Sequence, residues 1–195
     1  LDPNAEPFEY VEDGLIKGVS GDLLNVIEAK LNVEFKWAGN NTLEEGLSFI
    51  IDGKATFLPM LTKTQERARY LEYTKPHIVI SNVIFSREGP AAYSSLRSLN
   101  GKTISQVPGF SATENIKRDY PDIHILEVEN VIDAILKVST GEADAYIGSI
   151  PVAMKHIAEN SLTNIQVSGE TPYLMMAGMA VSKNKLFLRV FYKIL

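Results

Sequence analysis

The chain of 195 residues is 45% hydrophobic and 22% charged, which is typical of a globular protein that can bury a full core. A net charge of −5, without any run of Lys and Arg, excludes the basic face that nucleic-acid binding requires. The absence of cysteine excludes disulfides, thiolate catalysis and Cys-ligated zinc. The longest apolar runs are far shorter than the roughly 20 residues of a membrane-spanning helix.

The first part of the chain alternates between helical and strand-like apolar periodicity, which is typical of α/β folds with mainly parallel sheets and flanking helices. Ser20 precedes a predicted helix with one apolar stripe, and a strand is expected over residues 33–37. Thr42 and Glu45 form a predicted capping box for a second helix. Further strands are expected over residues 57–60 and 77–85.

The second part repeats this alternation after a polar segment at residues 86–92. Expected strands cover residues 102–107, 124–128 and 143–147, and the helices are expected to begin at Ser111, Asn130 and Pro151. A strand over residues 176–181 then returns the chain to the first part, and a final helix is expected over residues 185–195. These crossings predict two lobes, with residues 1–86 and 176–195 in lobe 1 and residues 87–175 in lobe 2.

Seven short segments carry a family resemblance: residues 7–10 (PFEY), 18–24 (GVSGDLL), 61–67 (LTKTQER), 73–76 (YTKP), 99–102 (LNGK), 107–109 (VPG) and 141–148 (GEADAYIG). In their order and spacing they resemble the family 3 periplasmic solute-binding proteins, and above all the flytrap sensor domains of bacterial sensor histidine kinases. The resemblance implies a two-lobed periplasmic-binding-protein-like fold of type II, with two hinge crossings and a ligand cleft between the lobes. It also implies a periplasmic, extracytoplasmic location.

Arg67 is the first candidate for a ligand contact. In the amino-acid-binding relatives, the pattern Thr-x-x-Arg that Thr64 and Arg67 form here presents a guanidinium to the ligand carboxylate. The planar fork of donors suits a two-point contact with a carboxylate. The resemblance implies that Thr62 also faces the ligand, whereas Thr64 is expected to cap the following turn. The alternative for Arg67 is a surface position like that of Arg69.

The second lobe offers a candidate anion site where a predicted helix begins. The resemblance implies that the turn at residues 109–111 delivers backbone N–H groups to the ligand carboxylate, and Ser111 with Glu114 forms a predicted capping box. A plain cap without a ligand is the alternative. Phe110 and Phe8 are weaker candidates for the site, because aromatic side chains belong more often to the core than to a ligand platform.

Ser149 marks the main departure from the family pattern. Classical amino-acid binders place an acidic residue here to pair with the ligand ammonium, and a hydroxyl cannot supply that charge. This argues against an ordinary α-amino acid unless another carboxylate such as Asp13 substitutes, although Ser149 stays a candidate contact. His77 also replaces the usual Tyr after Pro76. The expected ligand is a small polar solute with a carboxylate, either an amino acid or an organic acid.

The sequence contains no catalytic or metal-binding pattern. The three histidines, His77, His124 and His156, lack ligand spacing, and there is no nucleophile elbow, phosphate-binding loop or dinucleotide fingerprint. Asp144, inside an apolar strand, is expected to be a satisfied structural carboxylate. We therefore expect no cofactor, no metal and no enzymatic activity in this domain. A dehydratase-type enzyme on the same fold is the remote alternative.

Two functions share this predicted fold. One is the ligand-sensing domain of a membrane sensor histidine kinase, and the other is the solute-binding protein of an ABC amino-acid transporter. Ser149, the segment at residues 169–173 (GETPY) and the expected end of the chain within a helix favour the sensor. The partners implied are a small-molecule ligand, the membrane and a cytoplasmic output domain. A homodimer is left open, and nucleic acid is excluded.

Overall fold

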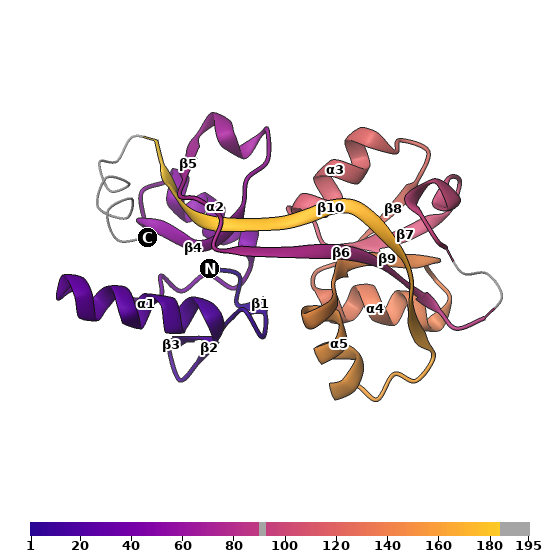
Figure 1. The fold of residues 1–195 in the computed structure, drawn as a ribbon, viewed down its shortest axis with the longest axis horizontal. Helices are drawn as coiled ribbons and strands as arrows, with labels where there is room; N and C mark the ends of the chain where they lie inside the picture. The colour runs from indigo at the N-terminus through magenta and orange to yellow at the C-terminus, as the bar shows by residue number, and fades with distance from the viewer. Residues whose placement is uncertain (90–92, 184–195) are drawn as a thin grey trace. The chain divides into compact units, whose positions relative to one another are not determined.

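The computed structural model describes residues 1–89 and 93–183. The chain divides into two compact units: unit 1 comprises residues 1–79 and the chain from Met176 onward, and unit 2 comprises residues 80–175. Two strands, β6 (Ile78–Arg87) and β10 (Ile165–Ser182), carry the chain from one unit to the other (Figure 1). The lobe boundary expected between residues 86 and 87 stays a prediction.

Unit 1 begins with a small antiparallel sheet of β1 (Asn4–Ala5), β2 (Glu9–Glu12) and β3 (Leu15–Lys17). Helix α1 (Gly18–Leu31) follows directly, and helix α2 (Leu43–Ile51) comes after an extended stretch. Strands β4 (Phe57–Thr62) and β5 (Leu71–Tyr73) both pair antiparallel with the last part of β10. The pairing of β4 with β10 shifts register between Leu58 and Leu61, where Pro59 has no N–H to donate.

The two helices of unit 1 pack against opposite faces of β10. Met179 packs with Leu24 and Ile27 of α1, whereas the next residue, Ala180, packs in the cluster that contains Ile50 of α2. Successive side chains of a strand point to opposite faces. The order of these buried residues therefore places one helix on each side of the strand.

Unit 2 contains a sheet with a parallel centre: β8 (His124–Glu127), β7 (Thr103–Gln106) and β9 (Ala145–Ser149). Strand β6 pairs antiparallel with β9. The connecting helices are α3 (Ser111–Asp119) and α4 (Val131–Thr140), and α5 (Ile150–Glu159) follows β9. The parallel strands are joined by helical crossovers, as parallel pairing requires.

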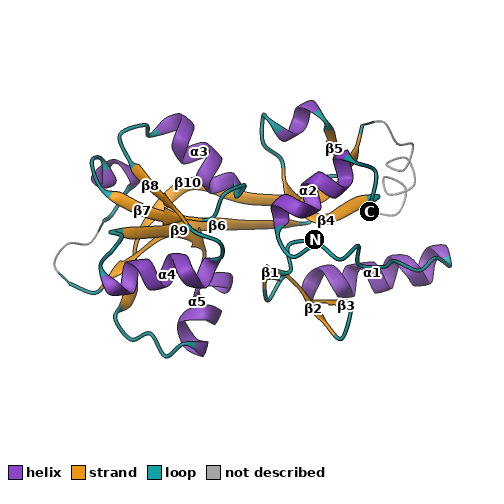
Figure 2. Cartoon of the chain, turned by 180° about the vertical axis from the view of Figure 1, so that it is seen from behind, coloured by secondary structure: helices purple, strands orange, loops and turns teal. Residues whose placement is uncertain are grey.

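Helices cover both faces of the sheet in unit 2. Ile104 of β7 packs with Ala112 and Ile116 of α3. The next residue, Ser105, donates from its hydroxyl to the Ala134 carbonyl of α4 at 2.6 Å. Figure 2 shows α3 on one side of the strands, and α4 and α5 on the other. This layered arrangement is the α/β class that the sequence predicts.

Local capping signals in the sequence are confirmed at two helices. Asn130 accepts a hydrogen bond from Asp133 N at 2.9 Å, and Gly141 ends α4 with a φ of 89° that favours glycine. Thr42 Oγ1 accepts from Glu45 N at 3.1 Å where α2 begins, although Glu45 Oε2 accepts from Asn41 N instead of Thr42 N, so the predicted capping box forms only in part. Both caps depend on residues that are close in sequence, so the pattern alone was sufficient to predict them.

The predictions are less accurate for elements whose formation depends on residues far away in sequence. The strand expected over residues 33–37 is wrong, because these residues lie outside every strand of the described chain. The strand expected over residues 176–181 is only the end of β10, which begins at Ile165. The final helix expected over residues 185–195 lies outside the described residues. An extended segment becomes a strand only where another segment can pair with it.

Candidate functional site

Arg67 lies in the turn after β4, within unit 1. Thr64 Oγ1 accepts a hydrogen bond from Arg67 N at 3.3 Å, but the N-cap residue of the 3-10 helix Arg67–Arg69 is Glu66, so Thr64 holds the turn without occupying the cap position. The Arg67 side chain is only 2% exposed, and its Nη1 donates to the carbonyl of Thr62 at 3.1 Å. This burial contradicts the surface alternative, whereas Arg69 is indeed exposed.

The geometry brings Thr62 and Arg67 together as the predicted pair in unit 1. Thr62 is the last residue of β4, where it pairs with Ala177 of β10, so the backbone that accepts from Arg67 is held by the sheet. A guanidinium keeps its charge at every ordinary pH. A buried cation whose position is fixed by the backbone is suited to recognise an anion.

Phe8 belongs to the buried part of unit 1. Its side chain is 7% exposed, and its carbonyl accepts from Ser20 N at 2.9 Å. Gly18 has a φ of 79°, and a Cβ there would lie 2.7 Å from the Phe8 carbonyl oxygen. The segment that contains Phe8 is therefore closely packed against the beginning of α1, which is a structural role.

Glu9, next to Phe8, is a buried carboxylate that the sequence pattern did not single out. Its Oε1 accepts from Asp2 N at 2.6 Å, and its Oε2 accepts from Ser20 Oγ at 2.9 Å. Burial raises the pKa of Glu9 to about 7, although the nearby ammonium of Leu1 opposes this shift. Glu9 therefore links the first residues of the chain to β2 and α1.

In unit 2, the candidate anion site is the beginning of α3. Gly109 has a φ of 77°, and Phe110 rather than Ser111 occupies the N-cap position, without a side-chain cap bond. The predicted capping box of Ser111 and Glu114 is therefore wrong, because Ser111 is already the first helical residue. The first N–H groups of a helix have no intrahelical acceptor and carry partial positive charge. They are suited to an anionic ligand.

A buried polar network holds this turn in place. Gln106, at the end of β7, is fully buried, and its Nε2 donates to the carbonyl of Ile147 in β9 at 3.1 Å. Thr113 Oγ1 donates to the carbonyl of Val107 at 2.8 Å. The beginning of α3 is thereby tied to the central strands of unit 2. A backbone site that must recognise an anion needs such a rigid support.

Ser149 is the last residue of β9 and the N-cap residue of α5. It is 6% exposed, it pairs with Asn82 of β6, and its hydroxyl makes no cap hydrogen bond. The helix therefore does not use the hydroxyl of Ser149. Asp144, near the other end of the same strand, accepts from Tyr93 Oη at 2.8 Å and from Thr103 N at 3.0 Å. Asp144 was predicted to be a satisfied buried carboxylate; it is satisfied, but its side chain is only partly buried.

His77 is a further residue of interest at the beginning of β6. Its backbone N donates to the carbonyl of Ala177 at 2.9 Å. Both ring nitrogens are buried and lack a hydrogen-bond partner among residues 1–89 and 93–183, and burial lowers the pKa of the imidazole. In the sequence, His77 is a single imidazole at the edge of an apolar run, and that pattern does not predict a buried ring.

Each unit thus contains one candidate anion-recognition element, a side chain in unit 1 and a helix N-terminus in unit 2. Within the described parts of the chain, no three His, Asp or Glu side chains are grouped so that they could hold a metal ion. None of the helices that the structure describes is both long and apolar enough to cross a bilayer.

Comparison with known proteins identifies the family. Residues 1–186 match the model of the bacterial extracellular solute-binding proteins, family 3. The chain belongs to this family. Membership confirms the two-lobed periplasmic-binding-protein-like fold and a binding rather than a catalytic domain.

Individual relatives include sensor proteins and binding proteins, among them the ABC transporter glutamine-binding protein GlnH of Bacillus subtilis, 24% identical over 129 residues, which is 64% of this chain and 45% of GlnH. The virulence sensor protein BvgS of Bordetella bronchiseptica is 28% identical over 142 residues, which is 72% of this chain and 12% of BvgS. A solved histidine kinase sensor domain with similarity to periplasmic binding proteins has a TM-score of 0.85 at 24% identity, covering 98% of this chain and 85% of its own. Holo ArgBP from T. maritima also has a TM-score of 0.85 at 24% identity, covering 99% and 85%. These two structures share the fold.

Proposed function

We propose that this chain is the extracytoplasmic ligand-sensing domain of a membrane sensor histidine kinase, and that it binds a small solute with a carboxylate. Membership in a family of extracellular solute-binding proteins supports the location and the binding role. The similarity to BvgS supports a sensor, although the chain spans only 12% of the length of that protein. The buried Arg67 guanidinium, held by the Thr62 carbonyl, is the observation that supports a carboxylate ligand.

The proposed mechanism uses one contact from each unit. The carboxylate accepts hydrogen bonds from Arg67 in unit 1 and from backbone N–H groups at residues 111–113 in unit 2. A ligand that contacts both units favours a closed state by its differential affinity for that state. The two strands β6 and β10 would transmit closure, because they are the connections between the units. The output is a change in the activity of an attached kinase.

A transporter solute-binding protein is the second candidate function. The fold shared with ArgBP supports it, since that protein binds its ligand with the same architecture. The identity of Ser149 favours the sensor, because a neutral N-cap hydroxyl offers no counter-charge to an amino-acid ammonium. Under the sensor proposal, therefore, the ligand is an organic acid rather than an α-amino acid.

The ligand proposal is tested by a thermal-shift screen against amino acids, dicarboxylates, other organic acids, amines and sugars, followed by calorimetry of each hit. A ligand that binds only the folded state raises the melting temperature. We expect a carboxylate hit whose affinity falls by at least about thirtyfold in Arg67→Met, because a buried charge pair loses one partner. Arg67→Lys should retain part of the affinity, and the exposed Arg69→Met is the matched control. Equal affinity of Arg67→Met and the native chain would remove Arg67 from the site.

The choice between sensor and transporter needs the full-length protein. In membranes that contain it, the carboxylate hit should change the rate of phosphate incorporation from ATP, and Arg67→Met should abolish that change without altering the basal rate. A protein that binds the ligand but is released from membranes and shows no phosphorylation would be a transport component.

A further inference from the structure

The segment at residues 169–173 (GETPY), which favours a sensor in the sequence, lies in the part of β10 that belongs to unit 2. A Cβ on Gly169 would clash with the carbonyl oxygen of Tyr93, so only glycine fits where these two segments approach each other. Thr171 Oγ1 donates to the carbonyl of Asn82 in β6 at 2.7 Å. The segment is therefore fixed to its neighbours inside unit 2.

Tyr173, at the end of this segment, joins β10 to helix α3, and Figure 1 and Figure 2 both show the two elements beside each other. Its Oη donates to Asp119 Oδ2 at 2.8 Å, and its ring packs against the core cluster that contains Ile116 of α3. The Asn115 carbonyl lies 3.4 Å from the same Oη, but the hydroxyl has one proton, and the shorter contact with a carboxylate is the stronger bond. Tyr173 thus holds the last turn of α3 by a hydrogen bond and by its ring.

Asp119 is an unusual residue for the place that it occupies. It is the last residue of α3, where the end of the helix carries partial negative charge, so a carboxylate there is unfavourable. Arg118 offsets this, since its Nε and Nη2 donate to the two carboxylate oxygens at 2.7 and 2.8 Å. Hydrogen bonds from Arg118, and then from Tyr173, lower the pKa of Asp119. The carboxylate therefore stays ionised as an acceptor for the Tyr173 hydroxyl.

Helix α3 has few apolar side chains that could fix its direction. Its buried residues are Ala112, Thr113 and Ile116, of which only Ile116 is large and apolar. Thr113 Oγ1 donates to the carbonyl of Val107, which ties the first turn to the residue after β7. The last turn is tied to β10 by Tyr173. The direction in which the first N–H groups of the helix point therefore depends on both attachments.

We infer that Tyr173 is a positioning residue of the ligand site, and that its bond to Asp119 makes α3 and β10 move together. This role rests on the proposed function, in which an anion binds the N–H groups at residues 111–113. Because a helix moves largely as a rigid element, a displacement of its first turn by a bound anion also displaces its last turn. The bond of Tyr173 passes that displacement to β10, which continues from unit 2 into unit 1.

The test follows backbone amide shifts of the chain while acetate is titrated at constant ionic strength. Acetate carries only the carboxylate that the proposed function requires. Tyr173→Phe removes the hydroxyl and keeps the ring. The matched control is Tyr120→Phe, because Tyr120 packs against the same cluster and its hydroxyl donates no hydrogen bond within residues 1–89 and 93–183. Asp119→Asn keeps an acceptor for the Tyr173 hydroxyl, whereas Asp119→Ala removes it, and both variants remove the charge.

In the native chain we expect acetate to shift the amides of residues 109–113 and, with the same Kd, those of residues 171–175. Tyr173→Phe should raise the Kd about threefold, the effect of one exposed hydrogen bond, and should lose the response at residues 171–175. Tyr120→Phe and Asp119→Asn should retain that response, and Asp119→Ala should lose it. The double variant Tyr173→Phe/Asp119→Ala should lose no more than either single variant. A loss of stability alone would leave the ratio of the two responses unchanged.

Equal responses at residues 171–175 in Tyr173→Phe and in the native chain would overturn the inference and leave the proposed function standing. A native response confined to residues 109–113 would do the same. No response at residues 109–113 in the native chain would contradict the proposed anion site and would overturn the inference with it. If Tyr173→Phe does not fold, the comparison of Asp119→Ala with Asp119→Asn decides in the same way.

Discussion

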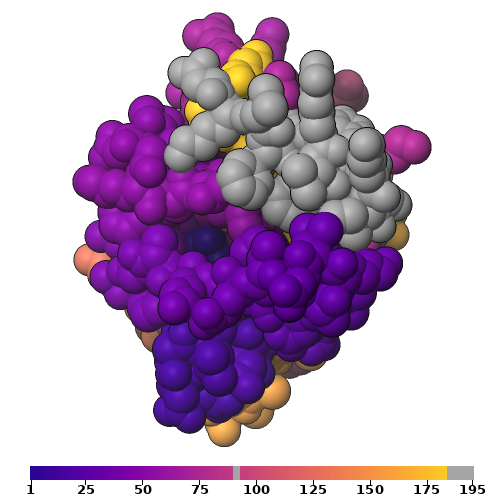
Figure 3. Space-filling view, turned by 90° about the vertical axis from the view of Figure 1, so that its left-hand side faces the viewer, coloured from indigo at the N-terminus to yellow at the C-terminus, as the bar shows by residue number. Residues whose placement is uncertain are grey.

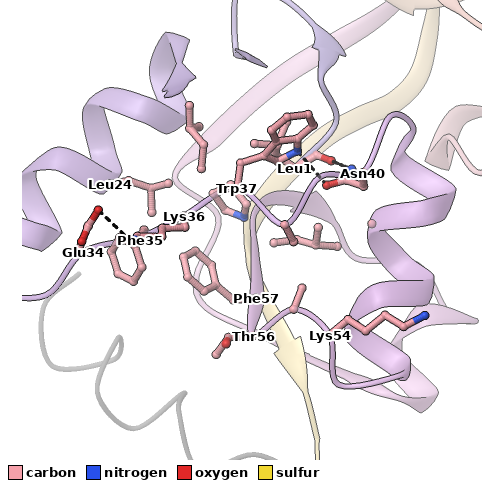
Figure 4. A pocket seen from close by; sticks show the side chains of 16 residues that line it. Leu1, Leu24, Glu34, Phe35, Lys36, Trp37, Asn40, Lys54, Thr56 and Phe57 are labelled. Atoms are coloured by element: carbon pink, nitrogen blue, oxygen red, sulfur yellow. Dashed lines mark hydrogen bonds and ion pairs between the residues drawn. The ribbon is translucent and has the colours of Figure 1, made fainter. Parts of the chain in front are cut away.

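Strand β7 (TISQ) in unit 2 lacks the apolar and polar alternation that residues 33–37 (VEFKW) in unit 1 show, yet only β7 is a strand. β7 lies between β8 and β9 and pairs with both. Residues 33–37 pair with no strand of the described chain, and residues 34–37 line a cavity in unit 1, which Figure 3 shows as a hollow and Figure 4 shows from close by. The comparison teaches that neighbouring strands, more than local alternation, decide whether a segment joins a sheet.

The largest expected difference between the two regions is in amide hydrogen exchange. The amides of Ile104 and Ser105 should exchange about a thousandfold more slowly than those of Lys36 and Trp37, because opening the centre of a sheet requires much of the global unfolding free energy. Exchange followed by NMR measures both sets in one sample. Equal protection of the two sets would show that residues 33–37 are already paired.

Shortening one side chain in each of these regions should lower the free energy of unfolding by different amounts. Ile104 is fully buried in unit 2, so Ile104→Ala should destabilise the protein by about 3 to 4 kcal/mol. Val33 is 45% exposed, so Val33→Ala should change stability by less than about 0.5 kcal/mol. Urea denaturation gives both values, and a large loss in Val33→Ala would show that Val33 is more tightly packed than its exposure indicates.

The pH dependence of stability should come from unit 1, through Glu9. The pKa of Glu9 rises from 4.5 to about 7 on folding, so the folded state keeps a proton that the unfolded state has lost. The resulting stability is fully present below pH 4.5 and is lost as the pH rises to 7, by about 3 kcal/mol in total. Glu9→Gln should remove this decline, because the amide does not titrate; its single oxygen can still accept from Asp2 N, and its Nε2 can donate to the Ser20 hydroxyl. Denaturation at pH 5 and pH 7.5 measures this decline in the free energy of unfolding.

The control for this change is Glu12→Gln, at an exposed position in the same strand. Protonation of His77 has the opposite sign, because its pKa is lowered on folding and stability therefore falls as the pH drops below 6.5. That contribution is present in the native chain and in both variants, so it cancels in the comparison. A decline of the same size in Glu9→Gln would contradict the role of Glu9.

The smallest expected effects on stability come from removing helix caps in the two units. Thr42→Ala and Asn130→Ala should each cost about 1 kcal/mol, because each removes an observed side-chain acceptor. Ser149→Ala should cost less than about 0.5 kcal/mol, since its hydroxyl makes no cap hydrogen bond. Thermal denaturation resolves these differences. A loss of 1 kcal/mol in Ser149→Ala would assign the hydroxyl a structural role instead of a place in the ligand site.

The same contrast explains which features the sequence could predict. Asn130, Gly141 and Thr42 act on neighbours within a few residues, so their patterns were sufficient. The first half of β10 was missed because its pairing depends on strands that lie far away in sequence. The capping box at Ser111 was misplaced by one position, because Phe110 takes the N-cap position without a side-chain bond.

In the candidate site, too, the local features could be predicted from the sequence and the tertiary ones could not. Thr64 and Arg67 form a local turn, and their spacing indicated the hydrogen bond that the structure shows. The burial of Arg67 and its bond to Thr62 depend on tertiary packing, so only the family resemblance pointed to them. The buried environments of Glu9 and His77 could not be predicted, because an acid in a short strand or a single imidazole shows its environment only after folding.

The most direct test of the proposed binding mechanism is one titration of the carboxylate hit into the labelled chain, followed by amide chemical shifts in both units. We predict that residues 62–67 in unit 1 and residues 109–113 in unit 2 shift together, with a single Kd. Residues 34–38 should not move. Shifts confined to one unit, or centred on residues 34–38, would contradict a ligand that Arg67 and the beginning of α3 hold in common.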